Sequence, residues 1–530
     1  FEAANRLGDM RGDLIGSMCA VTGKTVVEGD VEVSEGIDYA RFYTTTMKKF
    51  AALHDVDITS KGTILVISPW NFPCAIPIGG IVAGLAGGNT VILKPATVAA
   101  PVAWLFAKAF WDAGVPKEAL QVIITDREAL KELTTAPAIK HIILTGGTDT
   151  AQSIARINPS TPLSAETGGK NAIILTASGD RDHAIMNIVT SAFGNAGQKC
   201  SACSLLLVER SVYEDKNFQD KLKDAATSIK VGSVWEAGNV VGPMITNRND
   251  KLLQALTLEP GESWLVPPKF IDEKQYILAP TVKWGVKPGS YSFRTELFGP
   301  MLSVACIDNL QQGIELVNSL DYGLTSGLQS LDENEQKLWK DSILAGNLYI
   351  NRGITGAIVN RQPFGGMKLS AFGGGVKAGG PNYCACLVKI TDKPESNTDY
   401  KQSYPHAYEE EFAHARDINK LYGEQNAFRY LPLKNMVLRL FPGDSNEEAE
   451  MIALATKLCH TPLTISFDPN DDRTTALSST GCTLKKETLD EFLKTMRSYE
   501  RIRTCGADIP MEMYEEAARR NKYIATAKPV

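Results

Sequence analysis

The sequence predicts an α/β protein that is built on a parallel β-sheet, with a second and smaller α/β unit near its carboxyl end. Two observations carry this prediction. Short runs rich in β-branched and aliphatic residues alternate with helical stretches through the first half of the chain. These runs are continuously apolar, which is typical of strands that are covered by helices on both faces.

The elements of the first half follow from the amino end. Leu7, Met10, Leu14 and Met18 share one helical face, so the chain opens inside an amphipathic helix, and we expect a segment upstream of it. A second helix is expected over residues 35–53. The alternation then predicts strands at 62–68, 90–93, 121–125 and 141–145, with helices at 78–86, 99–112, 128–133 and 150–156.

The carboxyl-terminal part repeats the alternation on a smaller scale. Residues 392–430 are polar with few apolar clusters, which predicts an extended connector or arm. Strand, helix, strand, helix, strand and helix are then expected at 435–441, 447–458, 462–467, 484–497, 501–504 and 511–522. We expect this unit to serve packing or oligomerisation, with a catalytic role as the alternative.

Composition narrows the class of partner and compartment. The 530 residues carry a formal net charge of −6, without a dense Lys/Arg block, which argues against nucleic-acid contact and favours a small-molecule substrate. No apolar stretch reaches the ~18 residues of a membrane span, and the start lacks a signal peptide. We therefore expect a cytosolic or organelle-matrix protein whose ten scattered cysteines are reduced thiols.

Cys200 is the first candidate for chemistry. It stands at an element boundary between glycines and the apolar strand-like run 204–208, and Glu166 lies 34 positions earlier. A thiol with a reference pKa near ~8.5 needs N–H donors or a cation in order to ionise, and Lys199 is a candidate cation. A thiol nucleophile with a separate base indicates covalent chemistry on a carbonyl, and the alternative is a buried structural cysteine.

Candidate ligand-binding residues fall at the carboxyl ends of the predicted strands, where open parallel sheets bind nucleotides. Lys94 ends one strand, and Gly146-Gly147-Thr148 follows another and opens a helix. The Gly-x-Gly-x-x-Gly fingerprint is absent from the sequence, so a solvated lysine and a plain turn remain the alternatives. Asn71 stands between Pro69 and Pro73, which fix its backbone, so its amide is either an oxyanion donor or a self-capping turn residue.

Six motifs carry a family resemblance. They are Pro69-Trp70-Asn71-Phe72-Pro73, Lys94-Pro95, Gly146-Gly147-Thr148, Glu166-Thr167-Gly168-Gly169-Lys170, Gly197-Gln198-Lys199-Cys200 and Glu296-Leu297-Phe298-Gly299-Pro300. In order and spacing they resemble the aldehyde dehydrogenase superfamily over about residues 1–390. The stretches around Cys200-Ser201-Ala202, residues 355–359 and residues 361–366 are most similar to Δ1-pyrroline-5-carboxylate dehydrogenase, the second enzyme of bifunctional proline utilisation A proteins.

The resemblance implies a reaction and the residues that perform it. It implies NAD-dependent oxidation of L-glutamate γ-semialdehyde to L-glutamate, in which Cys200 attacks the aldehyde, Asn71 holds the oxyanion and Glu166 activates water. It implies cofactor contacts from Ser68, Pro69, Trp70, Lys94, Thr97, Gly146, Gly147, Thr148, Glu296 and Phe298. Substrate contacts are implied for Phe193, Ser201, Gly356, Ala357 and Phe364.

The same resemblance implies an organisation of the chain. We expect a Rossmann-like NAD-binding domain at 1–168, a catalytic domain at 169–375, a connector or oligomerisation arm at 376–430 and the small α/β domain at 431–530. A proline dehydrogenase half with FAD is expected upstream and would allow peripheral contact with the inner membrane, and the protein is expected to form a homo-oligomer. Thr97 stands where many NAD-dependent relatives have a glutamate, so NADP stays open as the cofactor.

Three other functions compete with this one. A general aldehyde dehydrogenase of other specificity is the nearest. A zinc or redox thiol protein is suggested by Cys200-Ser201-Ala202-Cys203 and Cys384-Ala385-Cys386, but about 180 residues separate the two pairs and no histidine lies near them, so no metal is expected. A non-catalytic structural relative is opposed by the joint presence of Cys200, Glu166 and Asn71.

Overall fold

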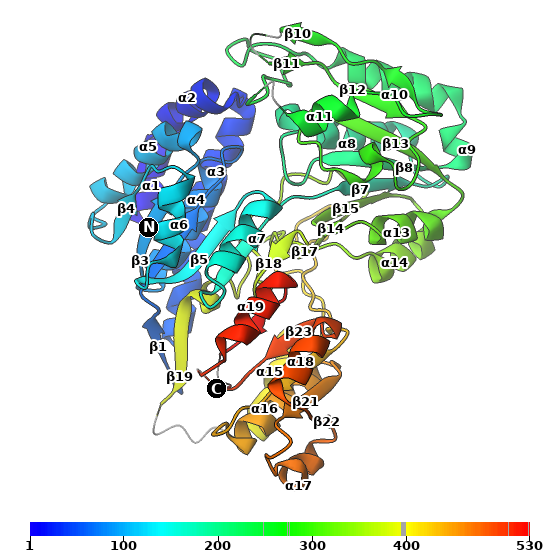
Figure 1. The fold of residues 1–530 in the computed structure, drawn as a ribbon. Coiled ribbons are helices and arrows are strands. Elements are labelled where there is room, and N and C mark those ends of the chain that lie inside the picture. Colours follow the sequence, from blue (N-terminus) through cyan, green and yellow to red (C-terminus); the bar gives the residue numbers. More distant parts are fainter. Residues whose placement is uncertain are drawn as a thin grey trace.

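Three β-sheets organise the computed structural model, which describes residues 1–246, 249–272, 274, 276–393, 399–506, 508–527 and 529. In Figure 1 the first lobe is blue to cyan, the second is green, and the carboxyl-terminal unit, orange to red, lies below both. Among the described residues no helix is both long and apolar enough to cross a membrane.

The first lobe confirms the predicted α/β alternation. Its six-stranded sheet has the order β18-β6-β5-β2-β3-β4, in which only the pairing of β18 with β6 is antiparallel. The strands are β2 (Thr63–Ile67), β3 (Thr90–Lys94), β4 (Leu120–Val122), β5 (Ile139–Thr145), β6 (Leu163–Glu166) and β18 (Ala371–Phe372). The helices between them are α4 (Ala75–Ala86), α5 (Ala100–Asp112), α6 (Arg127–Thr135) and α7 (Thr148–Ile157).

The amino-terminal helices differ in their bounds from the prediction. The opening helix is broken at Met10 into α1 (Glu2–Asp9) and α2 (Arg11–Thr22). The next helix, α3 (Val26–Ala51), begins earlier than expected, because the Thr25 side chain caps it by accepting a hydrogen bond from the Glu28 N–H at 3.4 Å. Its first turns contain Gly29 and many polar residues, which weakens the sequence signal for a helix there.

The second lobe holds a seven-stranded sheet of order β16-β15-β7-β8-β13-β12-β9, in which only β9 is antiparallel to its neighbour. Its strands are β7 (Asn171–Leu175), β8 (Cys203–Glu209), β9 (Ser263–Val266), β12 (Thr281–Trp284), β13 (Met301–Ile307), β15 (Thr325–Gln329) and β16 (Asn347–Ile350). The main helices are α8 (Arg181–Phe193), α10 (Lys216–Ser228), α13 (Leu310–Asn318) and α14 (Glu333–Ser342).

The chain then returns to the first lobe before it reaches the carboxyl-terminal unit. Strand β19 (Val388–Asp392) pairs antiparallel with β1 (Val56–Ser60). Short elements complete both lobes: α9 (Arg210–Tyr213), α11 (Asp250–Ala255), α12 (Tyr291–Arg294), β10 (Phe270–Asp272), β11 (Ile277–Leu278), β14 (Tyr322–Gly323) and β17 (Met367–Lys368). The expected extended connector contains helix α15 (Tyr400–Ala407), because the Asp399 carboxylate accepts the Lys401 N–H at 2.9 Å and starts a helix.

The carboxyl-terminal unit is a five-stranded parallel sheet of order β22-β21-β20-β23-β24. Its elements are β20 (Met436–Arg439), α16 (Asn446–Leu458), β21 (Leu463–Phe467), α17 (Thr474–Leu477), β22 (Thr483–Lys486), α18 (Leu489–Thr495), β23 (Arg501–Arg503), α19 (Met511–Arg519) and β24 (Ile524–Ala525). The prediction of one helix over 484–497 is wrong at its start. Residues 483–486 extend the sheet edge, and a capping box of Thr488 and Glu491 begins the helix later.

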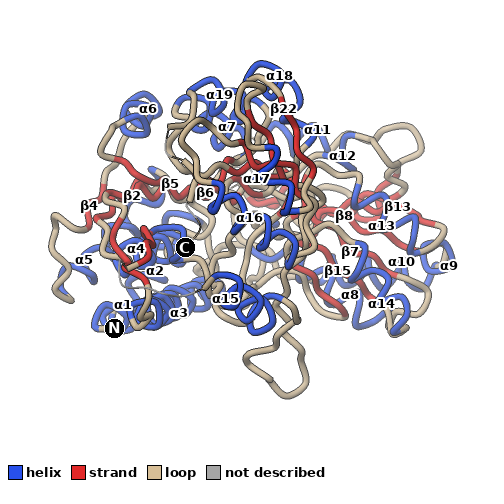
Figure 2. Tube along the Cα trace, turned by 90° about the horizontal axis from the view of Figure 1, so that it is seen from below, coloured by secondary structure: helices blue, strands red, loops and turns tan. Residues whose placement is uncertain are grey.

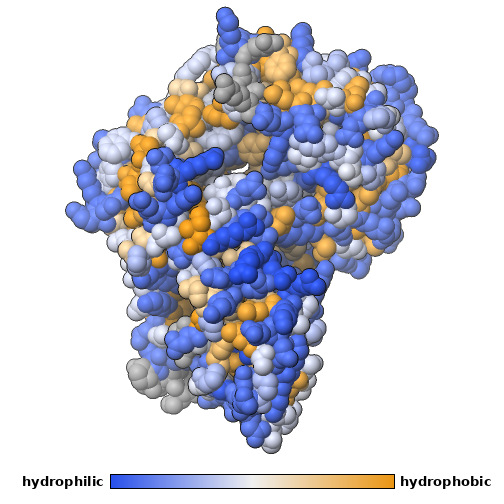
Figure 3. All heavy atoms as spheres, viewed as in Figure 1, coloured by the Kyte–Doolittle hydropathy of each residue, from blue (hydrophilic) through white to orange (hydrophobic). Residues whose placement is uncertain are grey.

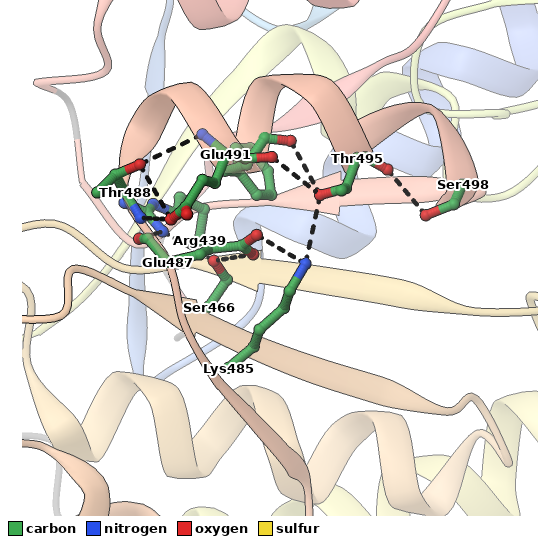
Figure 4. A network of polar contacts seen from close by, with 9 residues as sticks. Arg439, Ser466, Lys485, Glu487, Thr488, Glu491, Thr495 and Ser498 are labelled. Carbon is green, nitrogen blue, oxygen red and sulfur yellow. Dashed lines mark hydrogen bonds and ion pairs between the residues drawn. The ribbon is translucent and has the colours of Figure 1, made fainter.

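A buried charged network ties together the ends of three strands of this unit (Figure 4). The Arg439 guanidinium donates to the Ser466 hydroxyl at 2.8 Å and to the Glu487 carbonyl at 2.9 Å. The Glu487 carboxylate accepts from Ser466 at 2.7 Å and pairs with the Lys485 ammonium at 2.6 Å. Since buried charges are tolerated only when they are paired, this network fixes the arrangement of β20, β21 and the residues after β22.

The tube view in Figure 2 shows the strands of the two larger sheets at opposite sides of the molecule, with loops between them. On the face drawn in Figure 3, hydrophilic residues predominate, apolar ones are scattered, and an opening lies between the first and second lobes. The carboxyl ends of β2, β3, β5 and β6 belong to one edge of the first sheet, because these strands are parallel.

Candidate active site

A cavity of about 130 Å³ brings together residues from both lobes. Glu166, the last residue of β6, and Cys200, which precedes β8, both line it, although 34 residues separate them in sequence. Ser201, Gly356, Ala357 and Phe364 share its wall. The structure therefore gathers the predicted nucleophile, the predicted base and four of the five predicted substrate residues around one space.

The Cys200 thiol is held in its protonated form. Burial raises its pKa to about 12, and the carboxylates of Glu296 and Glu166 add to this effect, while the N–H groups of Ser201 and Cys200 oppose it. Lys199 does not supply the cation suggested by the sequence, because its ammonium pairs with the Glu28 carboxylate at 2.8 Å. Since the thiol keeps its proton at neutral pH, attack on a carbonyl requires a base that removes it.

Asn171 fixes the loop that carries Cys200. Its side-chain amide nitrogen donates to the carbonyl oxygens of Cys200 at 2.6 Å and Ala202 at 3.0 Å. Its amide oxygen accepts the N–H of Thr325, the first residue of β15, at 3.0 Å. The loop is thereby attached to the second sheet on both sides of the nucleophile.

Glu166 is a buried carboxylate with a raised pKa. Burial is the main cause, and it is opposed by the Lys377 ammonium and by the Gly366 N–H, which donates to Glu166 Oε2 at 3.1 Å. A carboxylate with a pKa above the ordinary range of glutamate accepts a proton more readily near neutral pH. Glu166 therefore has the protonation behaviour of a general base.

Asn71 lies beside the nucleophile loop. It is buried, and its amide nitrogen donates to the Gln198 carbonyl at 3.0 Å. Because a carboxamide has two N–H donors, this bond fixes the side chain and leaves one donor for a ligand oxygen. The Gln198 side chain in turn accepts the Ile245 N–H at 2.8 Å, which holds the peptide that Asn71 contacts.

The predicted substrate residues are not all where the sequence suggested. Gly356 has φ +80°, so its backbone adopts a conformation that favours glycine, and its N–H follows into the cavity-lining turn with Ala357. Phe193 is completely buried and packs in the hydrophobic core of the second lobe, away from the described cavity wall. Phe72, which follows Asn71, lines the cavity together with Phe364. Phe193 is thus a core residue, and Phe72 takes the place expected for it.

The predicted cofactor residues of β2 and β3 meet at the carboxyl edge of the first sheet. The Ser68 N–H donates to the Lys94 carbonyl at 3.1 Å, so the strand ends that carry Ser68-Pro69-Trp70 and Lys94 lie side by side. The Ser68 hydroxyl is buried without a hydrogen-bond partner among the described residues. Burial lowers the pKa of Lys94, while Thr97 is exposed at the start of the next helical turn. An unpaired buried hydroxyl indicates a polar ligand at this edge.

The Gly146-Gly147-Thr148 turn lies at the same edge. The Gly146 N–H donates to the Glu166 carbonyl at 3.1 Å, which joins this turn to the base. Gly147 precedes helix α7, which has no side-chain cap among the described residues. Free N–H groups at a helix start attract anions, so the turn suits a phosphate.

Glu296 and Phe298 approach the site from the second lobe. The Glu296 carboxylate accepts the Gly169 N–H at 2.9 Å, and burial raises its pKa. A Cβ atom at Gly168 would stand 2.2 Å from Glu296 Oε2, so only glycine permits this approach. The Phe298 ring meets the Trp70 ring edge-on, with centroids 5.8 Å apart. These contacts bring the predicted cofactor residues of the two lobes together.

The model of the aldehyde dehydrogenase family matches residues 1–391 of the sequence. The chain belongs to the aldehyde dehydrogenase family. The resemblance drawn from the six sequence motifs is thus confirmed, and with it the α/β fold class.

The relatives of this aldehyde dehydrogenase point to one branch of the family. A 1-pyrroline-5-carboxylate dehydrogenase from Geobacillus sp. (strain WCH70) is 33% identical over 406 residues, which are 72% of this chain and 78% of the relative. The enzyme of the same name from Bacillus subtilis (strain 168) is 31% identical over 404 residues, with 72% and 78% covered.

Solved structures agree with these relatives. Proline utilization A from Corynebacterium freiburgense superposes with a TM-score of 0.87 at 37% identity and covers 99% of this chain and 54% of its own. The Thermus 1-pyrroline-5-carboxylate dehydrogenase with bound NAD has a TM-score of 0.69 at 31% identity, covering 74% and 79%. The present chain therefore spans about half the length of the Corynebacterium protein.

Glu35, Phe72 and Asn171 are site residues of this aldehyde dehydrogenase that the sequence did not single out. Glu35 projects from α3 into the cavity wall, and burial raises its pKa to about 8. The Pro69–Pro73 motif contained Phe72, and Asn171 follows Lys170 directly, so proximity to a motif is the signal for both. Glu35 lies on a helix with many acidic residues and has no such signal.

The second cysteine of the Cys-x-x-Cys pattern has a structural role. Cys203 begins β8, is buried, and its thiol lies 3.4 Å from the Leu205 carbonyl. All ten cysteines are free thiols, as the sequence predicted. Within the described ranges, no cluster of three His, Cys, Asp or Glu side chains is arranged to hold a metal ion.

Proposed function

We propose that this chain oxidises L-glutamate γ-semialdehyde, the open form of Δ1-pyrroline-5-carboxylate, to L-glutamate with NAD as the hydride acceptor. The single observation that carries the proposal is that Ser201, Gly356 and Ala357 line the same cavity as Cys200 and Glu166. A thiol and a base are thus combined with donors for a carboxylate. The names of the relatives give independent support.

The first half of the reaction forms a bond between sulfur and carbon. As Cys200 Sγ adds to the aldehyde carbon, its proton passes to the Glu166 carboxylate, which lies close enough to raise the thiol pKa. The carbonyl oxygen becomes an oxyanion that accepts hydrogen bonds from the free N–H of Asn71 and from the Cys200 backbone N–H. Each such donor is worth roughly 3–4 kcal/mol of barrier. Bound NAD supplies a two-electron acceptor for the hydride that leaves this carbon.

The second half releases the product. A thioester remains on Cys200, and Glu166, after its proton has left, takes a proton from water as the water oxygen adds to the thioester carbon. The C–S bond then breaks, and the carboxylate of glutamate is released together with the thiolate of Cys200. Glu166 serves both halves because it faces the cavity from the end of β6.

Recognition of the substrate rests on its charged end. The Ser201 hydroxyl and the N–H groups of Gly356 and Ala357 would bind the α-carboxylate, while Glu35 would accept the α-ammonium. Phe72 and Phe364 would pack on the aliphatic stem between the two ends. A cavity of about 130 Å³ suits a molecule of this size.

The residues at the edge of the first sheet fit NAD. Ser68 and Lys94 would contact the adenosine ribose side, the uncapped start of α7 after Gly146-Gly147 would face the pyrophosphate, and Glu296 with Phe298 would hold the nicotinamide ribose. Thr97 is exposed and places no carboxylate against a 2′-phosphate, so NADP stays an alternative.

The organisation of the chain is part of the proposal. Residues 1–168 would bind the cofactor, 169–375 carry the catalysis, 376–430 connect and 431–530 support packing or a homo-oligomer. The similarity to proline utilization A proteins supports a place for this chain in a bifunctional cytoplasmic protein, with a proline dehydrogenase half that holds FAD.

A panel of aldehydes tests the function. We expect cofactor reduction with glutamate semialdehyde to exceed that with pentanal by on the order of a hundredfold in kcat/KM, because pentanal lacks both charged groups. NAD and NADP are compared in parallel. Equal rates with both aldehydes would make the chain a general aldehyde dehydrogenase, and no reduction with either would contradict the enzymatic function.

A further inference from the structure

Lys377 is a lysine beside the active site that the reaction scheme does not use. Its ammonium donates to the carbonyl oxygens of Gly346 at 2.7 Å and Gly365 at 2.5 Å, and to the Asn347 side-chain oxygen at 3.3 Å. An ammonium has three donors, so all of them are directed at fixed acceptors. Lys377 is therefore anchored in one position.

The turn that Lys377 grips is the turn that holds Glu166. The Gly366 N–H, next in sequence to the gripped Gly365, donates to Glu166 Oε2 at 3.1 Å. A Cβ atom at Gly365 would stand 3.1 Å from Glu166 Oε1 and 3.1 Å from Lys377 Cγ. The carboxylate and the lysine stem thus lie against the same glycine.

We propose that Lys377 is a positioning residue for the base Glu166: it fixes the Gly365–Gly366 turn and keeps a positive charge beside the carboxylate. This inference rests on the proposed role of Glu166 in thioester hydrolysis. In that role the carboxylate must be unprotonated and aimed at water in the cavity, and Lys377 serves both requirements.

The charges around Glu166 support this role. Cys200, Tyr39 and Tyr383 all interact electrostatically with Glu166 and are neutral near pH 7, since burial raises the pKa of each. Among the described groups whose charge shifts the pKa of Glu166, Lys377 is the cation that lowers it. Glu166 in turn raises the pKa of Lys377, against the effect of burial.

Lys368 offers a matched control. It lies nine positions earlier, is also half-buried, and its ammonium donates to the carbonyls of Asn318 at 2.8 Å and Leu320 at 2.9 Å. It therefore anchors backbone in the same way as Lys377. Glu166 is not among the groups that shift its pKa.

The test compares Lys377→Met, Lys377→Arg and Lys368→Met with the unchanged chain. Rapid mixing separates the first burst of reduced cofactor from the later steady rate, and both are followed from pH 6 to 9. Hydrolysis of a p-nitrophenyl ester, which acylates the thiol without cofactor, is measured over the same range.

For Lys377→Met we expect a burst at near-normal amplitude, a pH midpoint of deacylation about one unit higher, and a steady rate at pH 7 about tenfold lower, as one pKa unit requires. Lys377→Arg should restore the midpoint, and Lys368→Met should keep it. A midpoint in Lys377→Met equal to that in Lys368→Met would overturn the inference. The absence of a burst in the unchanged chain would instead contradict the proposed function.

Discussion

The side-chain amide of Asn171 donates a hydrogen bond of 2.6 Å to the carbonyl oxygen of Cys200. The same amide reaches Ala202 and Thr325, so one residue at the start of β7 joins the nucleophile loop to β8 and β15. The position of the thiol is thereby set by the second sheet and not by the loop itself. Substitutions at Asn171 should act on the chemistry without touching a substrate.

Asn171→Ala is expected to lower kcat by roughly ten- to a hundredfold, because misplacement of a reacting atom by about 1 Å has effects of that size. KM should change less, since the donors for the substrate carboxylate are elsewhere in the cavity. Steady-state kinetics and the rate of Cys200 alkylation by iodoacetamide check this. An unchanged kcat in a folded variant would show that the loop holds its own shape.

Cys200→Ala should abolish aldehyde oxidation while cofactor binding remains, because the thiol forms the covalent bond and is not expected to contact the cofactor's adenosine end. Cys203→Ala is the matched control, as it removes a buried free thiol three positions away. It should keep most of the activity. Calorimetric titration with NAD and turnover assays measure both effects, and turnover by Cys200→Ala would refute its role as nucleophile.

Glu166→Gln should slow thioester hydrolysis more than hydride transfer, so that reduced cofactor appears in a burst followed by a slow phase. In the unchanged chain, deacylation needs the carboxylate form, and burial raises the pKa of Glu166. The rate should therefore rise with pH and reach half its maximum well above ~4.3, the ordinary value for glutamate. A midpoint at the ordinary value, or equal slowing of both phases in the variant, would argue against Glu166 as the base.

Ser201→Ala should weaken the preference for glutamate semialdehyde by about 10- to 150-fold in kcat/KM, the range for one hydrogen bond of ~1.5–3 kcal/mol to a charged group. The rate with pentanal should stay nearly constant, because that aldehyde has no carboxylate to lose. Competition between the two aldehydes measures the ratio. A parallel fall for both substrates would instead indicate that Ser201 supports Cys200.

Glu32→Ala should lower the free energy of unfolding by roughly 3–5 kcal/mol, because it leaves a buried lysine without its partner. The Glu32 carboxylate pairs with Lys24 at 3.1 Å and accepts the N–H groups of Cys74 and Ala75 at the start of α4. Asp220→Ala, which breaks an exposed pair with Lys216, should cost no more than ~1 kcal/mol. Urea unfolding of both variants makes the comparison.

The predictable part of the fold is the part with local signals. The strands at 63–67, 90–94 and 139–145 are continuous apolar runs between helices, and their sequence pattern is decisive. The strand at 483–486 was taken for helix because its alternation is short and its partner β21 lies elsewhere in sequence. Helix α3 was found late in its course because its first turns are polar, and only its packing against α4 makes them helical.

The predictable part of the site is the part that lies within motifs. Cys200, Glu166 and Asn71 were identified by their neighbours in sequence, and the cavity brings the first two together. Phe193 was misplaced because its sequence distance from Cys200 is small while its ring points into the core. Glu35 was missed because nothing in the spacing of α3 indicates which side chain faces a cavity 165 positions away in sequence.

The sequence by itself determined the family, the α/β class and the pair of groups that perform the chemistry, because these depend on residue types in short ordered motifs. Only the tertiary structure decided that Lys199 pairs with Glu28, that Asn171 holds the nucleophile, and that Lys377 lies against the turn of Glu166. These relationships join residues from different sheets and helices. Their protonation states follow from burial, which no local stretch of sequence specifies.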